Sequence, residues 1–256
     1  MRIDKYLAEN GFPSRTKAAR AIAEGRVRLN GKIAVPSDSV GEGDVVEVEK
    51  SEVSFVSEGG FKLYKALTEF GEDVGGGVFA DIGASTGGFT DCLLQSGAAR
   101  VYAVDVGESQ LDKSLTGDER VVVMDNRNAR YLCADDFPDI LDGAVTDVSF
   151  ISLSLVLPSV AGIVKRGGRV FALVKPQFEC GQKALDKHGV VKQAKDREKA
   201  VFTVCEAALR CGLRPKKVTN APIKPRKNIE YIVMFERADV GGMTAEETAA
   251  KSRILT

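Results

Sequence analysis

The feature that most constrains the fold is an alternation of apolar strands with helices, which begins after Gly59. The first helix of this region places Leu63, Ala66, Leu67 and Phe70 on one face. We predict seven strands after it, at Val78–Ile82, Val101–Asp105, Val121–Met124, Ala144–Asp147, Arg169–Lys175, Lys216–Ala221 and Glu230–Glu236. A long amphipathic helix, ended by Gly212, separates the fifth strand from the sixth. This order predicts an α/β fold with a doubly wound, mostly parallel sheet, whose ligands bind at the carboxyl ends of the strands.

The first 50 residues have a different organisation, with two short helices followed by short strands. Apolar residues at helical spacing begin at Ile3, and Ser14 is a candidate N-cap for a second helix that runs to about Glu24. The Asn30-Gly31 pair predicts a tight hairpin, because both positions tolerate a positive φ. The predicted plan is a small α+β domain at 1–50, a linker at 51–58, the α/β domain at 59–238 and a C-terminal tail at 239–256.

Composition narrows the class of protein. Lys plus Arg and Asp plus Glu both number 36, so the net charge does not indicate a nucleic-acid partner, and such a signal must come from local clusters. The five cysteines form no CxxC pair and His188 is the single histidine, so we expect no metal site and reduced thiols in a cytosolic protein. The N-terminus has no signal-like stretch, and serines and Pro158 interrupt the most apolar segment, Val148–Val164, so we expect no membrane span.

The stretch ADIGASTGGFTDCL, residues 80–93, predicts a glycine-rich turn between a strand and a helix. The dinucleotide fingerprint GxGxxG is incomplete because Ser85 stands at its second glycine, and the triphosphate loop GxxxxGK[ST] lacks its lysine. Asp81 lies at the mouth of the turn, where a carboxylate repels phosphate and attracts a cation. The sulfonium and amino groups of S-adenosylmethionine are therefore candidate ligands.

Two further aspartates end neighbouring strands. Asp105 lies where an acid can accept hydrogen bonds from ribose hydroxyls, and Asp125 could meet an adenine edge. Enzymes that bind NAD use the same placement as Asp105, and aspartates at strand ends also form turns and cap helices, so neither residue alone identifies the ligand. Three consecutive strands that end in aspartate nevertheless favour a ligand-binding role.

Two lysines and two acids are predicted to meet at the same edge of the sheet. Asp147 ends the fourth strand and Lys175 the fifth. Lys62 lies on the early helix, and Glu230 begins the last strand. Methyl transfer to a hydroxyl needs a group that removes the proton, and a lysine can do so when burial or a neighbouring cation lowers its pKa from about 10.4. Each residue alone is more commonly a solvated surface charge, so the prediction rests on their joint placement.

The residues after the strands disfavour other methyl acceptors. An adenine or cytosine N-methyltransferase would carry an Asn/Asp-Pro-Pro-aromatic turn where this chain has Asp147-Val148-Ser149-Phe150. A carbon-5 pyrimidine methyltransferase would carry a cysteine nucleophile after a proline, and neither strand end has one. The sequence therefore favours oxygen as the acceptor.

Two sets of motifs resemble known families. Residues 1–49, with the GRVRLNG hairpin and the GDVVEV close, resemble a small RNA-binding domain first described in a ribosomal small-subunit protein. The motifs SEGGFKL, DIGASTGGFTDCLL, VDVG, TDVSFISL, LVKPQFE and NIEYIV resemble the FtsJ-like ribose 2′-O-methyltransferases. In this order, over residues 1–237, the chain resembles the TlyA family, also called hemolysin A-like. The resemblance implies a Rossmann-like S-adenosylmethionine methyltransferase sheet of seven strands, the last one antiparallel, and ribosomal RNA as the substrate.

The resemblance also implies roles for individual residues. A catalytic Lys-Asp-Lys-Glu tetrad falls on Lys62, Asp147, Lys175 and Glu230, and Lys175 is expected to deprotonate the 2′-hydroxyl. The implied S-adenosylmethionine contacts are Asp81, Gly83, Ser85, Gly87, Gly88, Phe89, Asp105 and Asp125. Two positions depart from the family pattern, since Glu58 stands where an arginine is expected and Lys227 where a glycine commonly precedes the Asn.

An excess of basic side chains within residues 1–32 predicts a phosphate-binding face. The basic residues are Arg2, Lys5, Arg15, Lys17, Arg20, Arg26, Arg28 and Lys32. Such clusters are commonly plain solvated surface, and it is the resemblance that favours RNA as the partner. A second basic stretch, Lys183 to Lys195, could form a loop that closes over the substrate, and we expect His188 within it to be exposed.

The leading hypothesis is an RNA ribose 2′-O-methyltransferase of the cytoplasm. One alternative is a non-catalytic RNA-binding or ribosome-assembly module that keeps the cofactor pocket only for its fold, and the complete tetrad argues against it. A second is a membrane-active hemolysin. The sequence disfavours it, because it shows no signal peptide, spanning segment or strongly amphipathic exposed helix.

Overall fold

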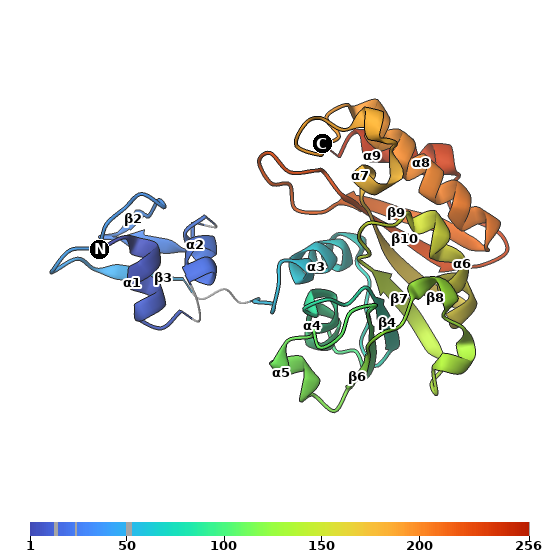
Figure 1. Ribbon diagram of the computed structural model, residues 1–256, viewed down its shortest axis with the longest axis horizontal. Helices are drawn as coiled ribbons and strands as arrows, with labels where there is room; N and C mark the ends of the chain where they lie inside the picture. Colours follow the sequence, from blue (N-terminus) through green and yellow to red (C-terminus); the bar gives the residue numbers. More distant parts are fainter. Residues whose placement is uncertain (13–14, 24, 50–52, 256) are drawn as a thin grey trace. The chain divides into compact units, whose positions relative to one another are not determined.

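The computed structural model describes residues 1–12, 15–23, 25–49 and 53–255, with the backbone alone at positions 16, 17 and 20. The chain divides into two compact units, Met1–Ser54 and Phe55–Thr256, and Figure 1 shows both. Ser14 and Glu24, the predicted ends of the second helix, lie outside the described residues, as does part of the predicted linker. The domain boundaries at residues 50 and 58 therefore stay predictions.

The first unit is a small α+β fold with its own core. Its elements are α1 (Ile3–Glu9), α2 (Arg15–Ala23), β1 (Val27–Leu29), β2 (Lys32–Ile33) and β3 (Val46–Val48). The strands form an antiparallel sheet in the order β2-β1-β3, and Asn30 and Gly31 turn the hairpin with φ values of 51° and 77°. Ile3 of α1 packs with Ile22 of α2 and Val27 of β1. The predicted hairpin and both helices are thus present.

The second unit contains one seven-stranded sheet. Its strands are β4 (Val78–Ile82), β5 (Arg100–Val104), β6 (Val121–Met124), β7 (Leu141–Thr146), β8 (Val164–Val174), β9 (Leu213–Asn220) and β10 (Tyr231–Arg237). Its helices are α3 (Gly59–Phe70), α4 (Gly88–Gln95), α5 (Lys113–Thr116), α6 (Leu157–Ile163), α7 (Pro176–Glu179), α8 (Ala194–Arg210) and α9 (Ala245–Arg253), with short 3-10 turns η1 (Ala129–Tyr131), η2 (Ala134–Asp136), η3 (Leu153–Leu155) and η4 (Gln182–Ala184). All seven predicted strands are present. The largest difference is at β8, which begins at Val164 rather than Arg169 because Val164 also pairs with Leu141 across a bulge.

The strand order determines where a ligand can bind. The order is β6-β5-β4-β7-β8-β10-β9, in which β10 alone runs opposite to the other six strands. The order reverses between β4 and β7, and such a switch point is where open α/β sheets bind their ligands. Because β10 is antiparallel, its first residue, Tyr231, pairs with Val174 at the end of β8. Glu230 therefore reaches the same edge as Lys175.

Helices cover both faces of the sheet. Helices α3 and α4 lie on one face, and α6, α8 and α9 lie on the other (Figure 1). Successive residues of a strand point to opposite faces, so Ala80 and Ile82 join the core on the α8 side whereas Asp81 bonds to Thr90 of α4. A buried carboxylate in a strand that is otherwise apolar is costly and indicates a functional role.

The C-terminal segment differs from the prediction. Residues 239–256 were expected to form a tail, but they contain α9, which packs against α8 and β9. The Thr244 hydroxyl accepts from the Glu247 amide while the Glu247 carboxylate accepts from the Thr244 amide, which is a capping box. Ala245 and Ala249 are buried. The Thr244-x-x-Glu247 pattern in the sequence is typical of a helix N-terminus, but the helix has few apolar residues and therefore shows no clear helical periodicity.

Three expectations drawn from composition concern disulfides, metal sites and membrane-spanning helices. All five cysteines are free of disulfides. No group of three potential metal ligands occurs within the described residues. In the same part of the chain, no helix combines the length and the apolar character that crossing a bilayer requires.

Gly88, at the start of α4, allows α4 to approach the start of α3. A Cβ at this position would lie 2.8 Å from the Gly60 backbone nitrogen and 3.0 Å from the Gly59 Cα. We expect Gly88→Ala to lower the free energy of unfolding by about 1–3 kcal/mol, because backbone atoms would have to move apart. Gly162→Ala is the matched control, since Gly162 lies in α6 with nothing within 4 Å of the added Cβ. Urea unfolding that shows equal stability for the Gly88 variant would contradict this account of the contact.

Candidate active site

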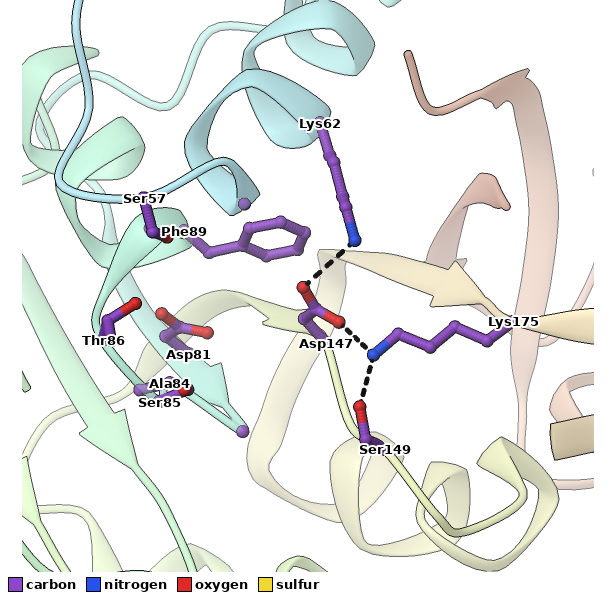
Figure 2. A pocket seen from close by; sticks show the side chains of 13 residues that line it. Ser57, Lys62, Asp81, Ala84, Ser85, Thr86, Phe89, Asp147, Ser149 and Lys175 are labelled. Carbon is purple, nitrogen blue, oxygen red and sulfur yellow. Dashed lines mark hydrogen bonds and ion pairs between the residues drawn. The ribbon is translucent and has the colours of Figure 1, made fainter. Parts of the chain in front are cut away.

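Two adjoining cavities lie at the carboxyl ends of β4, β5 and β7. The smaller has a volume of about 190 Å³ and is lined by the glycine turn and by both predicted catalytic lysines (Figure 2). The larger, about 520 Å³, extends along the end of β5 and the segment after β6. Gly83, Ser85, Asp147 and Ser149 line both cavities, so the two form one continuous cleft.

The glycine turn connects β4 to α4 and rests on the end of β5. The Gly83 amide donates to the Val104 carbonyl at 2.8 Å. Gly83 has a φ of 85°, and a Cβ there would lie 3.0 Å from the Asp147 carbonyl oxygen, so both conformation and space require glycine. The Asp105 carboxylate accepts from the Ser85 amide at 2.8 Å. The turn is thereby fixed between two strand ends.

Asp81 is fully buried beside the smaller cavity. Its Oδ2 accepts from the Thr90 amide at 2.8 Å and from the Thr90 hydroxyl at 2.7 Å. Its Oδ1 has no hydrogen-bond partner in the described part of the chain. Burial raises the pKa of Asp81 to about 7; the Thr90 bonds oppose this rise and the nearby Asp147 adds to it. A cationic hydrogen-bond donor would supply both the missing charge and the missing partner.

Most of the predicted cofactor residues line the cleft. Those that do are Asp81, Gly83, Ser85, Gly88, Phe89 and Asp105. Gly87 and Asp125 line neither cavity. A Cβ on Gly87 would lie 2.7 Å from Leu111, so Gly87 serves packing, and Asp125 accepts from the Ser109 amide at 2.9 Å. The wall near the end of β6 is instead formed by Asn128, three residues later.

The four predicted catalytic residues form one chain of contacts. Lys62 Nζ donates to Glu230 Oε2 at 2.8 Å and lies 3.7 Å from Asp147 Oδ2. Lys175 Nζ lies 2.6 Å from Asp147 Oδ1. Figure 2 shows both amines directed at the Asp147 carboxylate, one at each of its oxygens. The fold thus brings together all four residues, although 168 positions separate Lys62 from Glu230.

The two lysines have different surroundings. Burial acts to lower the pKa of Lys62, but Asp147 and Glu230 outweigh it and hold that pKa above the ordinary value. Lys62 is therefore an ammonium ion between two carboxylates. Lys175 pairs with Asp147 alone, and its side chain is 9% exposed against 23% for Lys62. Since a general base must be neutral before it accepts a proton, Lys62 is the poorer candidate of the two.

Three polar residues at this site were not predicted. Ser149 Oγ accepts from Lys175 Nζ at 2.7 Å, and Gln177 Nε2 donates to Glu230 Oε1 at 3.1 Å. Ser57 lines the smaller cavity from the segment before α3. Ser149 follows Asp147 by two positions, and Gln177 follows Lys175 by two. This spacing was a signal that the sequence already contained.

An exposed aromatic ring stands at the mouth of the larger cavity. Phe150 is 91% exposed and has a φ of 62°, which is uncommon for a bulky residue. Its ring centroid lies 5.2 Å from that of Phe178, next to the Lys175 loop. A strained, solvent-exposed aromatic side chain beside a polar cleft indicates a contact surface for a ligand.

The predicted RNA-binding residues lie in the first unit, where several of them pair with acids. Arg2 lies 3.1 Å and Arg15 2.7 Å from the Asp4 carboxylate, and Arg28 lies 3.3 Å from that of Glu49. The three arginine side chains remain 40–62% exposed. Their guanidinium groups are therefore oriented by acids and still accessible.

The remaining basic residues of this unit are less constrained. The Lys5 amine lies 3.7 Å from the Glu9 carboxylate. Arg26 donates to the backbone carbonyl of Glu49, the residue after β3, at 3.4 Å. Lys32 is exposed in the hairpin. The side chains of the other two predicted residues, Lys17 and Arg20, lie outside the described part of the structure.

The second basic stretch forms a compact turn. Leu185 pairs with Val191, and between them the Asp186 carboxylate accepts from the His188 and Val190 amides at 2.8 and 2.9 Å. These backbone hydrogen bonds hold the pKa of Asp186 well below its usual range. His188 is exposed. The two residues that depart from the family pattern, Glu58 and Lys227, lie outside this turn. Glu58 accepts a hydrogen bond from Lys224, which belongs to the connection between β9 and β10, and Lys227 lies in the same connection.

Comparison with known proteins assigns the family. The protein-family model described as FtsJ-like methyltransferase matches residues 55–237, which is most of the chain. The chain belongs to the FtsJ-like methyltransferase family. In this FtsJ-like protein the second unit is accordingly a methyltransferase domain, and the predicted α/β methyltransferase fold is confirmed. A second model, described as S4 domain, matches residues 1–46.

The FtsJ-like chain is similar to known proteins over nearly its whole length. It is 41% identical to a Mycobacterium tuberculosis protein named 16S/23S rRNA (cytidine-2′-O)-methyltransferase TlyA, over 91% of this chain and 88% of the relative. It is 39% identical to Hemolysin A of Brachyspira hyodysenteriae, over 92% and 99% respectively. A solved structure from Streptococcus thermophilus has 39% identity and a TM-score of 0.74, covering 98% of this chain and 94% of its own.

Proposed function

We propose that this protein is an S-adenosylmethionine-dependent methyltransferase that modifies ribose 2′-oxygens in ribosomal RNA. The observation that carries the proposal is the placement of Asp147 between Lys62 and Lys175, where the two cavities meet. This arrangement offers one lysine held as a cation and one candidate base. The similarity to the Mycobacterium tuberculosis rRNA (cytidine-2′-O)-methyltransferase supports both ribosomal RNA as the substrate and the ribose oxygen as the acceptor.

The acids of the cleft fit S-adenosylmethionine, which supplies a reactive methyl group when it is bound. Asp81 Oδ1 lacks a partner and would accept from the amino group of the cofactor. Asp105 would accept from ribose hydroxyls, since its two oxygens each receive one backbone amide, from Ser85 and Gly107, and each keeps a further lone pair. Val106 and Ala129 of the larger cavity offer apolar contact for a base. Asp125 and Gly87 have no comparable support.

The tetrad would then divide the work of moving one proton. Lys175 is the proposed base and takes the proton from the 2′-hydroxyl, while Asp147 orients its amine. Lys62, kept charged by Asp147 and Glu230, would stabilise the oxygen as negative charge develops on it. These groups are preorganised, because each amine already has its acidic partner before a substrate arrives.

The first unit and the mouth of the cleft would bind the RNA. The exposed arginines of the S4 domain fit phosphate contacts, which supply much of the affinity of such interfaces. Phe150 offers a ring on which an unstacked base can lie, as is common in single-stranded RNA recognition. A ribosomal substrate implies that the protein acts in the cytoplasm.

The test is a methylation map. Purified ribosomal subunits, incubated with the protein and S-adenosylmethionine, are expected to gain 2′-O-methyl groups at discrete positions. Ribosomal RNA from cells that lack the protein should lack the same groups. Methyl groups on base nitrogen or carbon atoms would contradict the proposed acceptor. Binding of RNA and cofactor without any transfer would support the assembly-module alternative instead.

A further inference from the structure

The amine of Lys175 has two polar partners, an ion pair with Asp147 and a hydrogen bond to Ser149, and the proposed tetrad accounts only for the first. Nζ lies 2.6 Å from Asp147 Oδ1 and 2.7 Å from Ser149 Oγ. Lys175 as a whole is only 8% exposed. Its approach to the Phe178 ring, 5.9 Å from the centroid, provides no further acceptor atom. The environment of the proposed base is therefore defined by one acid and one hydroxyl.

The protonation state of the Lys175 amine decides how many hydrogen bonds it can donate and whether it has a lone pair. An ammonium group has three N–H donors, whereas the neutral amine has two donors and one lone pair. The hydrogen bond to Ser149 fixes one N–H of the amine, and the ion pair with Asp147 holds the nitrogen in place, so the direction of the lone pair of the neutral amine is restricted. A base that could rotate freely would direct its lone pair at the substrate for only part of the time, and misorientation is costly in catalysis.

We propose that Ser149 is a positioning residue that fixes the Lys175 lone pair on the acceptor hydroxyl. The inference rests on the proposed function, in which Lys175 is the base. Ser149 follows Asp147 by two positions, so one short loop supplies both the ion-pair partner and the hydrogen-bond acceptor of Lys175. The same residue lines both cavities, at the junction where the methyl donor and the ribose would meet.

Ser149 can orient Lys175 although it contributes little to the stability of the fold. It is exposed, and among the described residues its hydroxyl accepts only from Lys175. Substitutions at exposed positions that take no part in a buried network, a helix cap or a strained turn usually change the free energy of unfolding little. Loss of the hydroxyl should therefore leave the folded state intact and change the rate of the chemical step.

The experiment compares Ser149→Ala with Ser149→Thr in steady-state methylation of ribosomal subunits, with single-turnover rates measured beside it to isolate the chemical step. We expect the alanine variant to lose roughly 10- to 100-fold in kcat. Its KM for RNA and Kd for S-adenosylmethionine should stay within about twofold of the wild type, because Ser149 acts through Lys175 and not through binding. The threonine variant keeps the hydroxyl and should recover most of the rate. Ser154→Ala, five residues further on, is the control, because the Ser154 hydroxyl has no partner among the described residues.

Several results would overturn the proposal. Wild-type kcat in Ser149→Ala would remove the positioning role. A threonine variant as slow as the alanine variant would show that the hydroxyl is not what matters, and a loss confined to KM would make Ser149 a binding residue. Lys175→Met, measured in parallel, separates this failure from that of the proposed function. If Lys175→Met is inactive while Ser149→Ala is fully active, only the present inference fails.

Discussion

Lys175→Met is expected to reduce methyl transfer by roughly 10³-fold while S-adenosylmethionine binding is retained. General bases contribute about 10²- to 10⁴-fold, and methionine preserves the length of the side chain without an amine. Asp147 keeps its other partner, Lys62, so the loop after β7 should hold its place. The measurement is single-turnover transfer of labelled methyl groups, with cofactor affinity determined separately by calorimetry.

Lys165→Met is the matched control. Lys165 lies at the opposite end of the same strand, β8, and also pairs with an aspartate, Asp142. It is remote from both cavities, and we expect wild-type turnover. If Lys175→Met retained turnover, the proton acceptor would have to be another group. If it lost cofactor affinity as well, the loss of rate could not be assigned to the base.

Asp81→Asn is expected to weaken S-adenosylmethionine binding by roughly 10- to 100-fold and to stabilise the protein above pH 7. Loss of a charge-assisted hydrogen bond accounts for the first effect. The second follows from the pKa of Asp81, which is raised to about 7 by burial. Between about pH 4 and pH 7 the folded protein retains a proton that the unfolded chain releases, so the free energy of unfolding falls as the pH rises. Asparagine has no such proton, and the variant should gain roughly 2–4 kcal/mol at pH 8.

The same pKa predicts a pH dependence of cofactor binding. A cation binds to the ionised form of Asp81, so affinity should increase up to about pH 7 and then level off, and Asp81→Asn should abolish this dependence. Asp142→Asn is the control with the opposite sign. The pKa of Asp142 is lowered because Lys165 and the Val78 amide oppose the effect of burial, so its variant should lose stability at neutral pH and bind the cofactor normally. Equal stability of Asp81→Asn and wild type across pH 4–8 would contradict the burial of a charge at this position.

Much of the fold was predictable because it depends on local patterns. Buried parallel strands are continuously apolar, and glycine turns and helix ends mark their boundaries, so strands such as β4, β5 and β6 could be located. The α9 helix was missed because it is short and mostly polar, and because its burial against α8 depends on tertiary contacts. The early start of β8 was missed because Gly167 and Gly168 are typical of a turn, yet the strand continues through them.

The site was predictable to the extent that strand ends define it. Asp147 and Lys175 end neighbouring strands, and parallel strands present those ends at one edge. Ser149 and Gln177 were missed because a single polar residue in a loop has many ordinary explanations. Asp125 stays a prediction, because its carboxylate accepts from the Ser109 amide and it lines neither cavity. The direction of a side chain in a turn depends on backbone angles that residue type alone does not determine.

The span of the tetrad along the chain has a consequence for biosynthesis. Lys62 precedes every strand of the large sheet, whereas Glu230 enters only with the final strand, β10, which must insert between β8 and β9. A growing polypeptide can therefore form the glycine turn and the parallel half of the sheet while its tetrad is still incomplete. Enzymatic competence would then arise at the last step of domain folding, so methylation activity also reports that the whole domain has been completed.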